Sequence, residues 1–188
     1  MKTFSYFTDG SIKIKFHENQ AIGSCGFILM RDSHIIRRKL VYSNPNINYL
    51  ECLAINLALI DLATFGTIGN EYVIYTDSLN TRNNLMRIYY SKEIFIPRTP
   101  FEIELVNTVN VLKSCVEKGL NFSIVHIRSH CTPSFQQTYL KKTQEFVVSI
   151  PQALYINNGN STIDELCNKK IWEMDNIQTI NYCPFAIC

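Results

Sequence analysis

The chain opens on a run of apolar residues that predicts a strand. Residues 4–8 place aromatic and β-branched side chains on both parities of this segment, which is typical of a strand buried on both faces. Asp9 and Gly10 follow, and an Asp-Gly pair favours a tight turn. Polar and apolar residues then alternate from residue 11 to residue 16. This alternation predicts a segment that pairs back on the first run as a hairpin.

Two further strands are expected before the pattern changes. Residues 24–30 form a second apolar run, and residues 34–42 follow it after a turn at residues 31–33. Three successive antiparallel strands are the simplest interpretation. A helix is then predicted from residue 49 to about residue 63, because apolar residues recur with a helical period. The residues that share its apolar face are Leu50, Leu53, Leu57 and Ile60.

The second half of the chain alternates strands with helices. Strands are predicted at residues 72–77 and 121–127, and helices at residues 78–90, 101–118 and 161–174, whereas residues 131–160 receive no assignment. This order predicts an α/β fold with a five-stranded mixed sheet flanked by helices. Helical crossovers lay later strands parallel to the first. Asp9 and Asp77, each expected at the end of a strand, should therefore lie side by side.

Composition limits the classes of protein to consider. The 188 residues are 46% apolar and 18% charged, which predicts one globular domain rather than disorder. A formal net charge of +2 does not indicate nucleic-acid binding by overall charge. Seven scattered cysteines suit neither a zinc site nor a disulfide framework, although Cys183 and Cys188 near the end are close enough in sequence to pair. With no leader and no long apolar run, we expect an intracellular protein, cytoplasmic or nuclear, that is not secreted and has no membrane partner.

Four acids stand at positions where chemistry is common. Asp9 and Asp77 follow apolar strands, and Glu51 and Asp164 fall in the expected first turns of helices. Each has an ordinary structural role open to it: a hairpin turn for Asp9, a helix cap for Asp77, dipole complementation for Glu51, and a capping box with Ser161 for Asp164. Together, however, they would place like charges close to one another unless a cation neutralised them. Oxygen ligands of this kind suit Mg²⁺.

These residues, in this order, resemble the ribonuclease H family of type 1. The matching segments are residues 8–11 (Thr-Asp-Gly-Ser), residues 48–54 around Glu51, residues 75–78 (Tyr-Thr-Asp-Ser), residues 128–130 (Arg-Ser-His) and residues 160–166 around Asp164. The resemblance covers roughly residues 1–174 and implies an endonuclease that cuts the RNA strand of an RNA–DNA hybrid.

The resemblance also implies roles for individual residues. Asp9, Glu51, Asp77 and Asp164 would hold two Mg²⁺ ions, or Mn²⁺, about 3.5–4 Å apart. His130 would assist proton movement or product release. Gly10, Ser11 and Asn48 match positions that contact the 2′-hydroxyl groups by which RNA differs from DNA. We expect a monomer with one catalytic domain over residues 1–174.

Some features depart from the family pattern. About 33 residues separate His130 from Asp164, where the family usually has a short loop, so residues 131–160 are interpreted as an insertion and residues 175–188 as a C-terminal tail. Two other functions fit parts of the pattern: a resolvase-like nuclease that acts on DNA, and an inactive fold that binds nucleic acid or a protein. The Asp-Gly-Ser motif argues against the first, and the presence of all four acids argues against the second.

Overall fold

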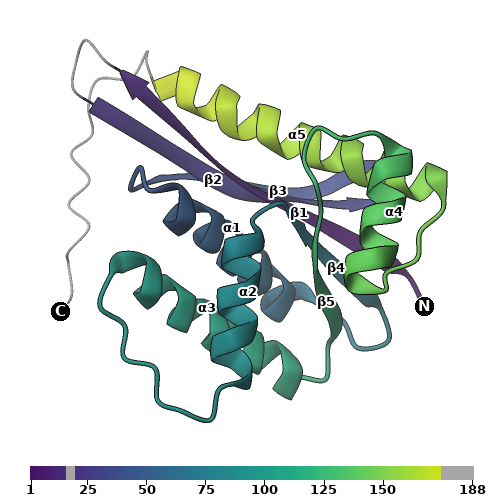
Figure 1. Ribbon diagram of the computed structural model, residues 1–188, viewed down its shortest axis with the longest axis horizontal. Coiled ribbons are helices and arrows are strands. Elements are labelled where there is room, and N and C mark those ends of the chain that lie inside the picture. The colour runs from purple at the N-terminus through teal and green to yellow at the C-terminus, as the bar shows by residue number, and fades with distance from the viewer. Residues whose placement is uncertain (16–19, 175–188) are drawn as a thin grey trace.

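A five-stranded mixed sheet forms the centre of the molecule. The computed structural model describes residues 1–15 and 20–174. Across the sheet the strands run in the order β3-β2-β1-β4-β5 (Figure 1). β1, β2 and β3 are antiparallel neighbours, whereas β4 is parallel to β1 and β5 is parallel to β4. The strands are β1 (Thr3–Lys15), β2 (Gln20–Arg31), β3 (His34–Ser43), β4 (Glu71–Thr76) and β5 (Asn121–His126). The predicted α/β class and mixed sheet are therefore confirmed.

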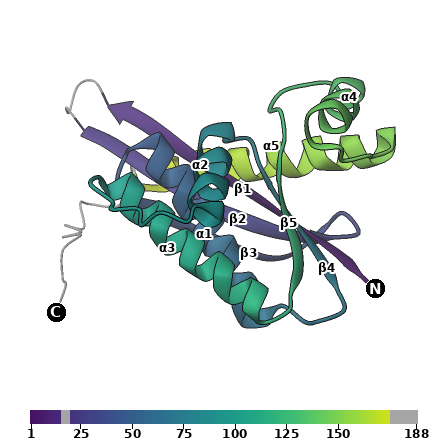
Figure 2. The same ribbon diagram turned by 60° about the horizontal axis from the view of Figure 1, so that its bottom comes forward.

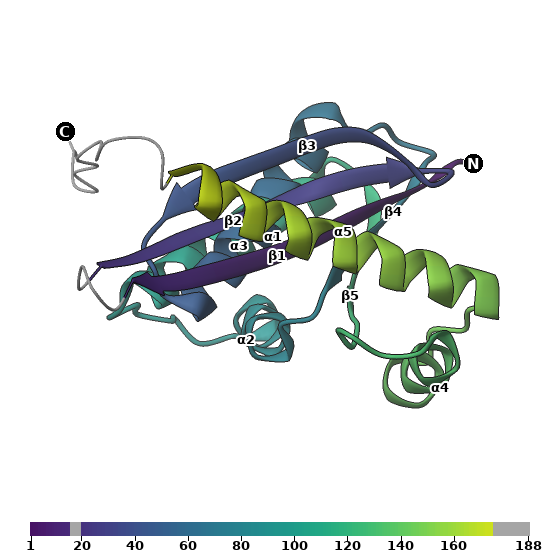
Figure 3. The same ribbon diagram turned by 90° about the horizontal axis from the view of Figure 1, so that it is seen from above.

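Helices cover both faces of this sheet. α1 packs against β1 and β2 on one face and against α3 on its outer side, and α2 lies beside them (Figure 2). On the opposite face α5 crosses over the strands (Figure 3), and α4 packs on α5. The helices are α1 (Ile47–Phe65), α2 (Leu79–Tyr90), α3 (Pro100–Glu117), α4 (Pro133–Gln144) and α5 (Ile150–Met174).

β1 contributes to an apolar core on each face of the sheet. Tyr6 belongs to the cluster beneath α1, and Phe7 belongs to the cluster beneath α5. Both side chains are fully buried. Successive residues of a strand point to opposite faces, and burying a large apolar side chain stabilises the fold by about 1.5–3 kcal/mol. The prediction of a strand buried on both sides is correct for this segment.

The predicted hairpin within residues 4–16 is wrong. β1 runs without a turn from Thr3 to Lys15, and Asp9 and Gly10 lie inside it, opposite Gly26 and Cys25 of β2. An Asp-Gly pair favours a turn locally, but β2 pairs with β1 continuously from Ser5 to Lys15. This long ladder outweighs the local preference. Asp9 is therefore in the middle of a strand and not at its end.

α1 begins earlier than predicted, so Glu51 is not in its first turn. The side chain of Asn46 caps the helix by accepting a hydrogen bond from the backbone N–H of Tyr49, and Glu51 falls in the second turn. The expected apolar face is also only partly right, because Ile60 is 42% exposed. α1 is enclosed by the sheet and by α3, and a helix covered on two sides is apolar on more than one face.

α5 begins at Ile150, eleven residues before the predicted start. Ser161 lies inside this helix, so the expected capping box with Asp164 is wrong. Residues 161–174 are helical as predicted, and Ile163, Cys167 and Ile171 form the buried face of this part of the helix. Residues 131–160, interpreted as an insertion, contain α4 and the first turns of α5. Residues 175–188, with Cys183 and Cys188, lie outside the described residues.

In the described part of the chain, α1 is the one helix whose length and composition would allow it to cross a membrane. Of the apolar window concerned, 56% is buried inside the fold. The core helix of a globular protein passes the same test, so α1 is weak evidence for a membrane span.

Candidate active site

Three of the predicted acids converge at one point. Asp9, Glu51 and Asp77 each offer a carboxylate oxygen, and these oxygens lie within 4.8 Å of one another. The parallel register of β1 and β4 explains part of this arrangement. Thr8 pairs with Thr76, so the next residues, Asp9 and Asp77, emerge side by side. Glu51 reaches them from α1, on the opposite face of β1 from α5.

Gly10 allows α1 to approach β1 closely enough to bring Glu51 to this point. A Cβ atom at Gly10 would lie 2.8 Å from the Cβ of Leu50 and 3.1 Å from the backbone nitrogen of Glu51. The backbone N–H of Gly10 also donates hydrogen bonds to the carboxyl groups of Asp9 and Glu51. Gly10 therefore allows the close approach of α1 and also orients the carboxyl groups of Asp9 and Glu51.

Asp164 approaches Asp9 from α5. The charge of Asp164 and its hydrogen-bonding contact with Asp9 both raise the pKa of Asp9. Asn168, one helical turn further on, donates to Oδ1 of Asp164 at 2.9 Å, and the Ser11 hydroxyl donates to Oδ1 of Asn168 at 2.6 Å. Sequence analysis did not select Asn168. Its spacing of four residues from Asp164 was the available signal.

Burial raises the pKa values of Asp9, Glu51 and Asp77, and repulsion by neighbouring acids adds to this effect at Asp9 and Glu51. Burial, followed by the charges of Asp77 and Asp164, raises the pKa of Asp9 to about 8. Burial and the charges of Asp9 and Asp77 hold the pKa of Glu51 well above its usual range. The pKa of Asp77 is also raised by burial, against hydrogen bonds that lower it. The ion pairs of the described residues, Arg31–Asp32 and Arg37–Asp61, lie elsewhere.

The site fits a divalent cation. Oε2 of Glu51 is buried and has no hydrogen-bond partner, and an unsatisfied buried carboxylate oxygen is costly. All the candidate ligands are carboxylate oxygens, which suit Mg²⁺ or Mn²⁺. A cation here would satisfy the oxygen of Glu51 and offset the repulsion among the three acids. Asp164, through its contact with Asp9, stands next to this group.

Two side chains orient the carboxylate of Asp77. It accepts hydrogen bonds from the side chains of Asn160 in α5 and Ser129 after β5. Asn160 is buried, and its own Oδ1 has no hydrogen-bond partner. Nε2 of the His126 imidazole lies 3.0 Å from the backbone oxygen of Asp77. Burial lowers the pKa of His126, which favours its neutral form.

His130 is not part of this cluster. It lies in an exposed turn after β5, with φ of 52°. Among the described residues, no hydrogen bond or ion pair connects His130 with the four acids. A part for His130 in proton movement stays a prediction.

Asn48 lies at the edge of the site and begins a row of polar side chains. Its Oδ1 accepts from Nδ2 of Asn80 at 3.1 Å. Asn84, one turn along α2, donates to Asn80, and Arg87 donates to Asn84. Asn48 and Asn80 are exposed. The row runs along α2 away from the acids. Asn48 is the one member of the row that was selected from the sequence.

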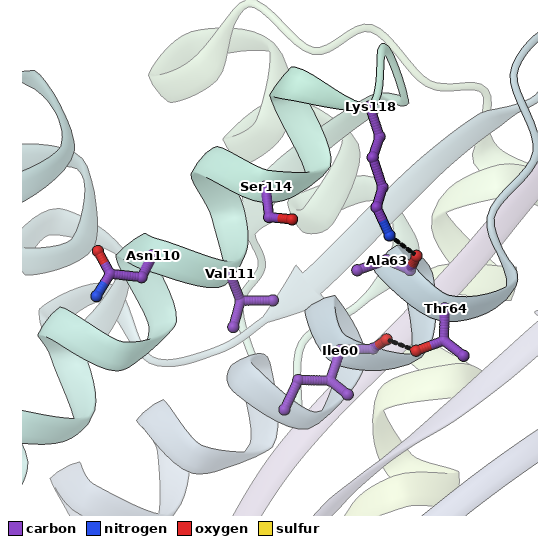
Figure 4. Close-up of a pocket in the computed structure, with 7 residues that line it drawn as sticks. All are labelled: Ile60, Ala63, Thr64, Asn110, Val111, Ser114 and Lys118. Carbon is purple, nitrogen blue, oxygen red and sulfur yellow. Dashed lines mark hydrogen bonds between the residues drawn. The ribbon is translucent and has the colours of Figure 1, made fainter.

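A hollow of about 650 Å³ lies elsewhere, between α1 and α3 (Figure 4). Its polar groups serve the helices. Nζ of Lys118 donates to the Ala63 carbonyl oxygen at 2.7 Å, and the Thr64 hydroxyl donates to the Ile60 carbonyl oxygen at the same distance. None of the predicted site residues lines this hollow, and we assign it no chemistry.

Comparison with known proteins decides the family. The model of the RNase H family matches residues 1–171. The chain belongs to the RNase H family. No curated protein sequence matches it. Among solved structures, the RNase H domain of PFV superposes with a TM-score of 0.61 at 12% identity, covering 90% of this chain and 94% of that one.

Two other similar structures are type 1 enzymes. LC9-RNase H1, described as a type 1 RNase H with the type 2 active-site motif, has a TM-score of 0.58 at 13% identity, covering 92% of this chain and 73% of that one. LC11-RNase H1, isolated from compost and solved in complex with an RNA/DNA hybrid, has a TM-score of 0.51 at 16% identity, with coverages of 89% and 99%. The fold of this RNase H family protein is thus that of type 1.

The raised pKa values predict how the metal-free protein responds to pH. An aspartate in an unfolded chain has a pKa of about 4, whereas Asp9 in the folded protein has a pKa of about 8. Between these values the folded state holds a proton that the unfolded state has lost, so stability falls as pH rises. In EDTA, the free energy of unfolding relative to Asp9→Asn should decrease from pH 5 to pH 8, as measured by urea denaturation. If the free energy of unfolding of wild type relative to Asp9→Asn stayed constant or increased from pH 5 to pH 8, the raised pKa of Asp9 would be contradicted.

Proposed function

We propose that this protein is an endoribonuclease that hydrolyses the RNA strand of RNA–DNA hybrids, with two divalent cations held by Asp9, Glu51, Asp77 and Asp164. The observation that carries the proposal is the convergence of Asp9, Glu51 and Asp77 within 4.8 Å in a chain of the RNase H family. A structure of similar fold, LC11-RNase H1, was solved in complex with an RNA/DNA hybrid, which supports this class of substrate.

The protein groups around the acids would prepare the site for phosphodiester hydrolysis. When bound, Mg²⁺ lowers the pKa of a coordinated water and neutralises charge on the phosphate. Asp9 interacts with Glu51, Asp77 and Asp164. It would therefore be the central ligand of the site. Gly10 orients Asp9 and Glu51 through its N–H, and Asn168 orients Asp164. These bonds would hold the oxygens in place before the cations arrive, so that less reorganisation is needed on binding.

Recognition of RNA would depend on polar groups beside the acids. The exposed amides of Asn48 and Asn80 can both donate to and accept from a 2′-hydroxyl group. Gly10 is buried, and Ser11 already donates to Asn168, so both act within the site. A contact of Gly10 or Ser11 with the substrate stays a prediction.

We expect Asn48→Ala to weaken binding of an RNA–DNA hybrid more than binding of duplex DNA. Loss of one hydrogen bond to a 2′-hydroxyl corresponds to about 1 kcal/mol, or roughly fivefold in Kd. Fluorescence anisotropy in EDTA measures both affinities without cleavage. Asn110→Ala, an exposed residue of α3 on the hollow of Figure 4, is the matched control and should change neither. Equal weakening for hybrid and duplex DNA would exclude a role for Asn48 in recognising RNA.

The proposed function is tested with a panel of labelled substrates. Wild-type protein and Asp77→Asn are incubated in Mg²⁺ with an RNA–DNA hybrid, duplex DNA, duplex RNA and a branched DNA junction. The proposal expects cleavage of the RNA strand of the hybrid by wild type only. Cleavage of branched DNA would instead indicate a resolvase-like nuclease, and binding of the hybrid without cleavage in Mg²⁺ or Mn²⁺ would indicate a binding module.

A further inference from the structure

Asp77 is held through its backbone as well as through its carboxylate. His126 ends β5 and is 2% exposed. Its partner in β4 is Thr76, so the imidazole lies next to Asp77, and Nε2 is 3.0 Å from the Asp77 carbonyl oxygen. A carbonyl oxygen can only accept. Nε2 of His126 therefore carries the proton and donates.

Tyr139 of α4 fixes the other nitrogen of this ring. Its hydroxyl oxygen lies 2.5 Å from Nδ1 of His126, and the two rings meet edge to face with their centroids 5.5 Å apart. In a neutral imidazole protonated at Nε2, Nδ1 accepts, so the hydroxyl of Tyr139 donates. This bond selects the tautomer of His126 that can donate to Asp77.

α4 also holds the backbone of His126. Oε1 of Gln144 accepts from the His126 N–H at 2.9 Å, and Nε2 of Gln144 donates to the His126 carbonyl oxygen. β5 is an edge strand, so one amide side chain supplies the bonds that a further strand would make. Figure 1 shows α4 next to this end of the sheet.

We propose that Tyr139 and His126 are positioning residues that hold the segment bearing Asp77 in the conformation that binds the divalent cation. The inference rests on the proposed function in one respect, that a cation binds at Asp77. It gives α4 a part in metal affinity, although α4 lies in the segment that the sequence presents as an insertion. Loss of a hydrogen bond between a metal-ligating residue and a neighbouring residue typically weakens metal binding about 10–100-fold. Because Tyr139 acts through His126, we expect an effect at the lower end, about tenfold.

The inference is tested by measuring Mn²⁺ binding to the full chain without nucleic acid. Electron paramagnetic resonance reports the concentration of free Mn²⁺. Tyr139→Phe removes one hydroxyl group and keeps the ring that packs in the core. Its Mn²⁺ affinity should fall about tenfold. Tyr155→Phe is the matched control, because Tyr155 packs on the same apolar cluster and its hydroxyl bonds to Ser5. It should bind Mn²⁺ like wild type, even if thermal unfolding shows a similar loss of stability in both variants.

His126→Gln separates positioning from packing. The amide nitrogen of glutamine can take the place of Nε2 and donate to Asp77, whereas His126→Leu has no donor. Mn²⁺ affinity should therefore be higher in the glutamine variant than in the leucine variant.

The outcomes distinguish this inference from the proposed function. Wild-type affinity in Tyr139→Phe would overturn the inference and leave the proposed function standing. If wild type bound no Mn²⁺, or if Asp77→Asn bound it equally well, the metal site itself would fail, and the inference with it.

Discussion

Replacement of Asp9 by asparagine is expected to abolish cleavage of the hybrid and, in the absence of metal, to make the protein more stable. Loss of a central ligand should cost several kcal/mol of transition-state stabilisation, which corresponds to a decrease in kcat/KM of at least about 10³-fold. The stability effect has the opposite sign because Asp9 is buried beside other acids and has a pKa of about 8. Each unit of raised pKa corresponds to about 1.4 kcal/mol.

The net gain in the free energy of unfolding should be about 1–3 kcal/mol at pH 8, because asparagine also loses hydrogen bonds that the carboxylate accepts. Urea denaturation in EDTA measures it. Asp32→Asn is the matched control, since Asp32 is 85% exposed and remote from the site. It should change neither kcat/KM nor the free energy of unfolding. If Asp9→Asn were inactive and also less stable than wild type, Asp9 would stabilise the metal-free fold. The expected destabilisation by a buried carboxylate beside other acids would then be wrong.

Gly159→Ala is expected to destabilise the protein and to lower activity. Inside a helix, alanine is normally favoured over glycine by about 1 kcal/mol. Here, however, a Cβ atom would lie 2.4–2.6 Å from three atoms of the Phe7 ring. The ring cannot move easily because it is fully buried, stacked on Tyr75 and packed edge to face on Tyr155. Overpacking of this kind costs about 1–3 kcal/mol, so the clash outweighs the gain in helix propensity.

The effect on activity follows from what α5 carries. Relief of the clash would push the helix away from β1, and with it Asn160 and Asp164, which contact Asp77 and Asp9. Asn158→Ala is the control, because Asn158 is the exposed neighbour in the same helix and gains helix propensity without a clash. Thermal unfolding and cleavage rates of both variants test the prediction. A stabilised Gly159→Ala with full activity would show that α5 does not need this close approach.

Three of the acids selected from the sequence lie together in the fold, whereas several of the elements that carry them differ from the prediction. The Thr-Asp pairs at residues 8–9 and 76–77 stand out because each follows an apolar run, and the parallel register places them together. The hairpin prediction failed because a local Asp-Gly preference cannot reveal that β2 pairs with both halves of β1.

The start of α5 and the role of His126 depend on contacts that are distant in sequence. Residues 157–160 (Asn-Asn-Gly-Asn) are typical of a loop, but the close packing of Gly159 on Phe7 stabilises helix there. A single histidine at the end of an apolar strand looks like a core residue. Its register with Thr76 and the contact of its Nε2 with the Asp77 carbonyl oxygen place it beside Asp77. Position beside an acid in a neighbouring strand was the signal that could have found it.

We propose that the site formed by Asp9, Glu51, Asp77 and Asp164 cuts RNA paired with DNA. The most direct test uses one labelled strand with a block of ribonucleotides flanked by deoxyribonucleotides and paired with complementary DNA, incubated with wild type and Asp77→Asn in Mg²⁺. The products are sized at single-nucleotide resolution. Cuts by wild type should be confined to the ribonucleotide block, and Asp77→Asn should make none. Cuts in the flanking DNA, or equal cleavage by Asp77→Asn, would contradict it.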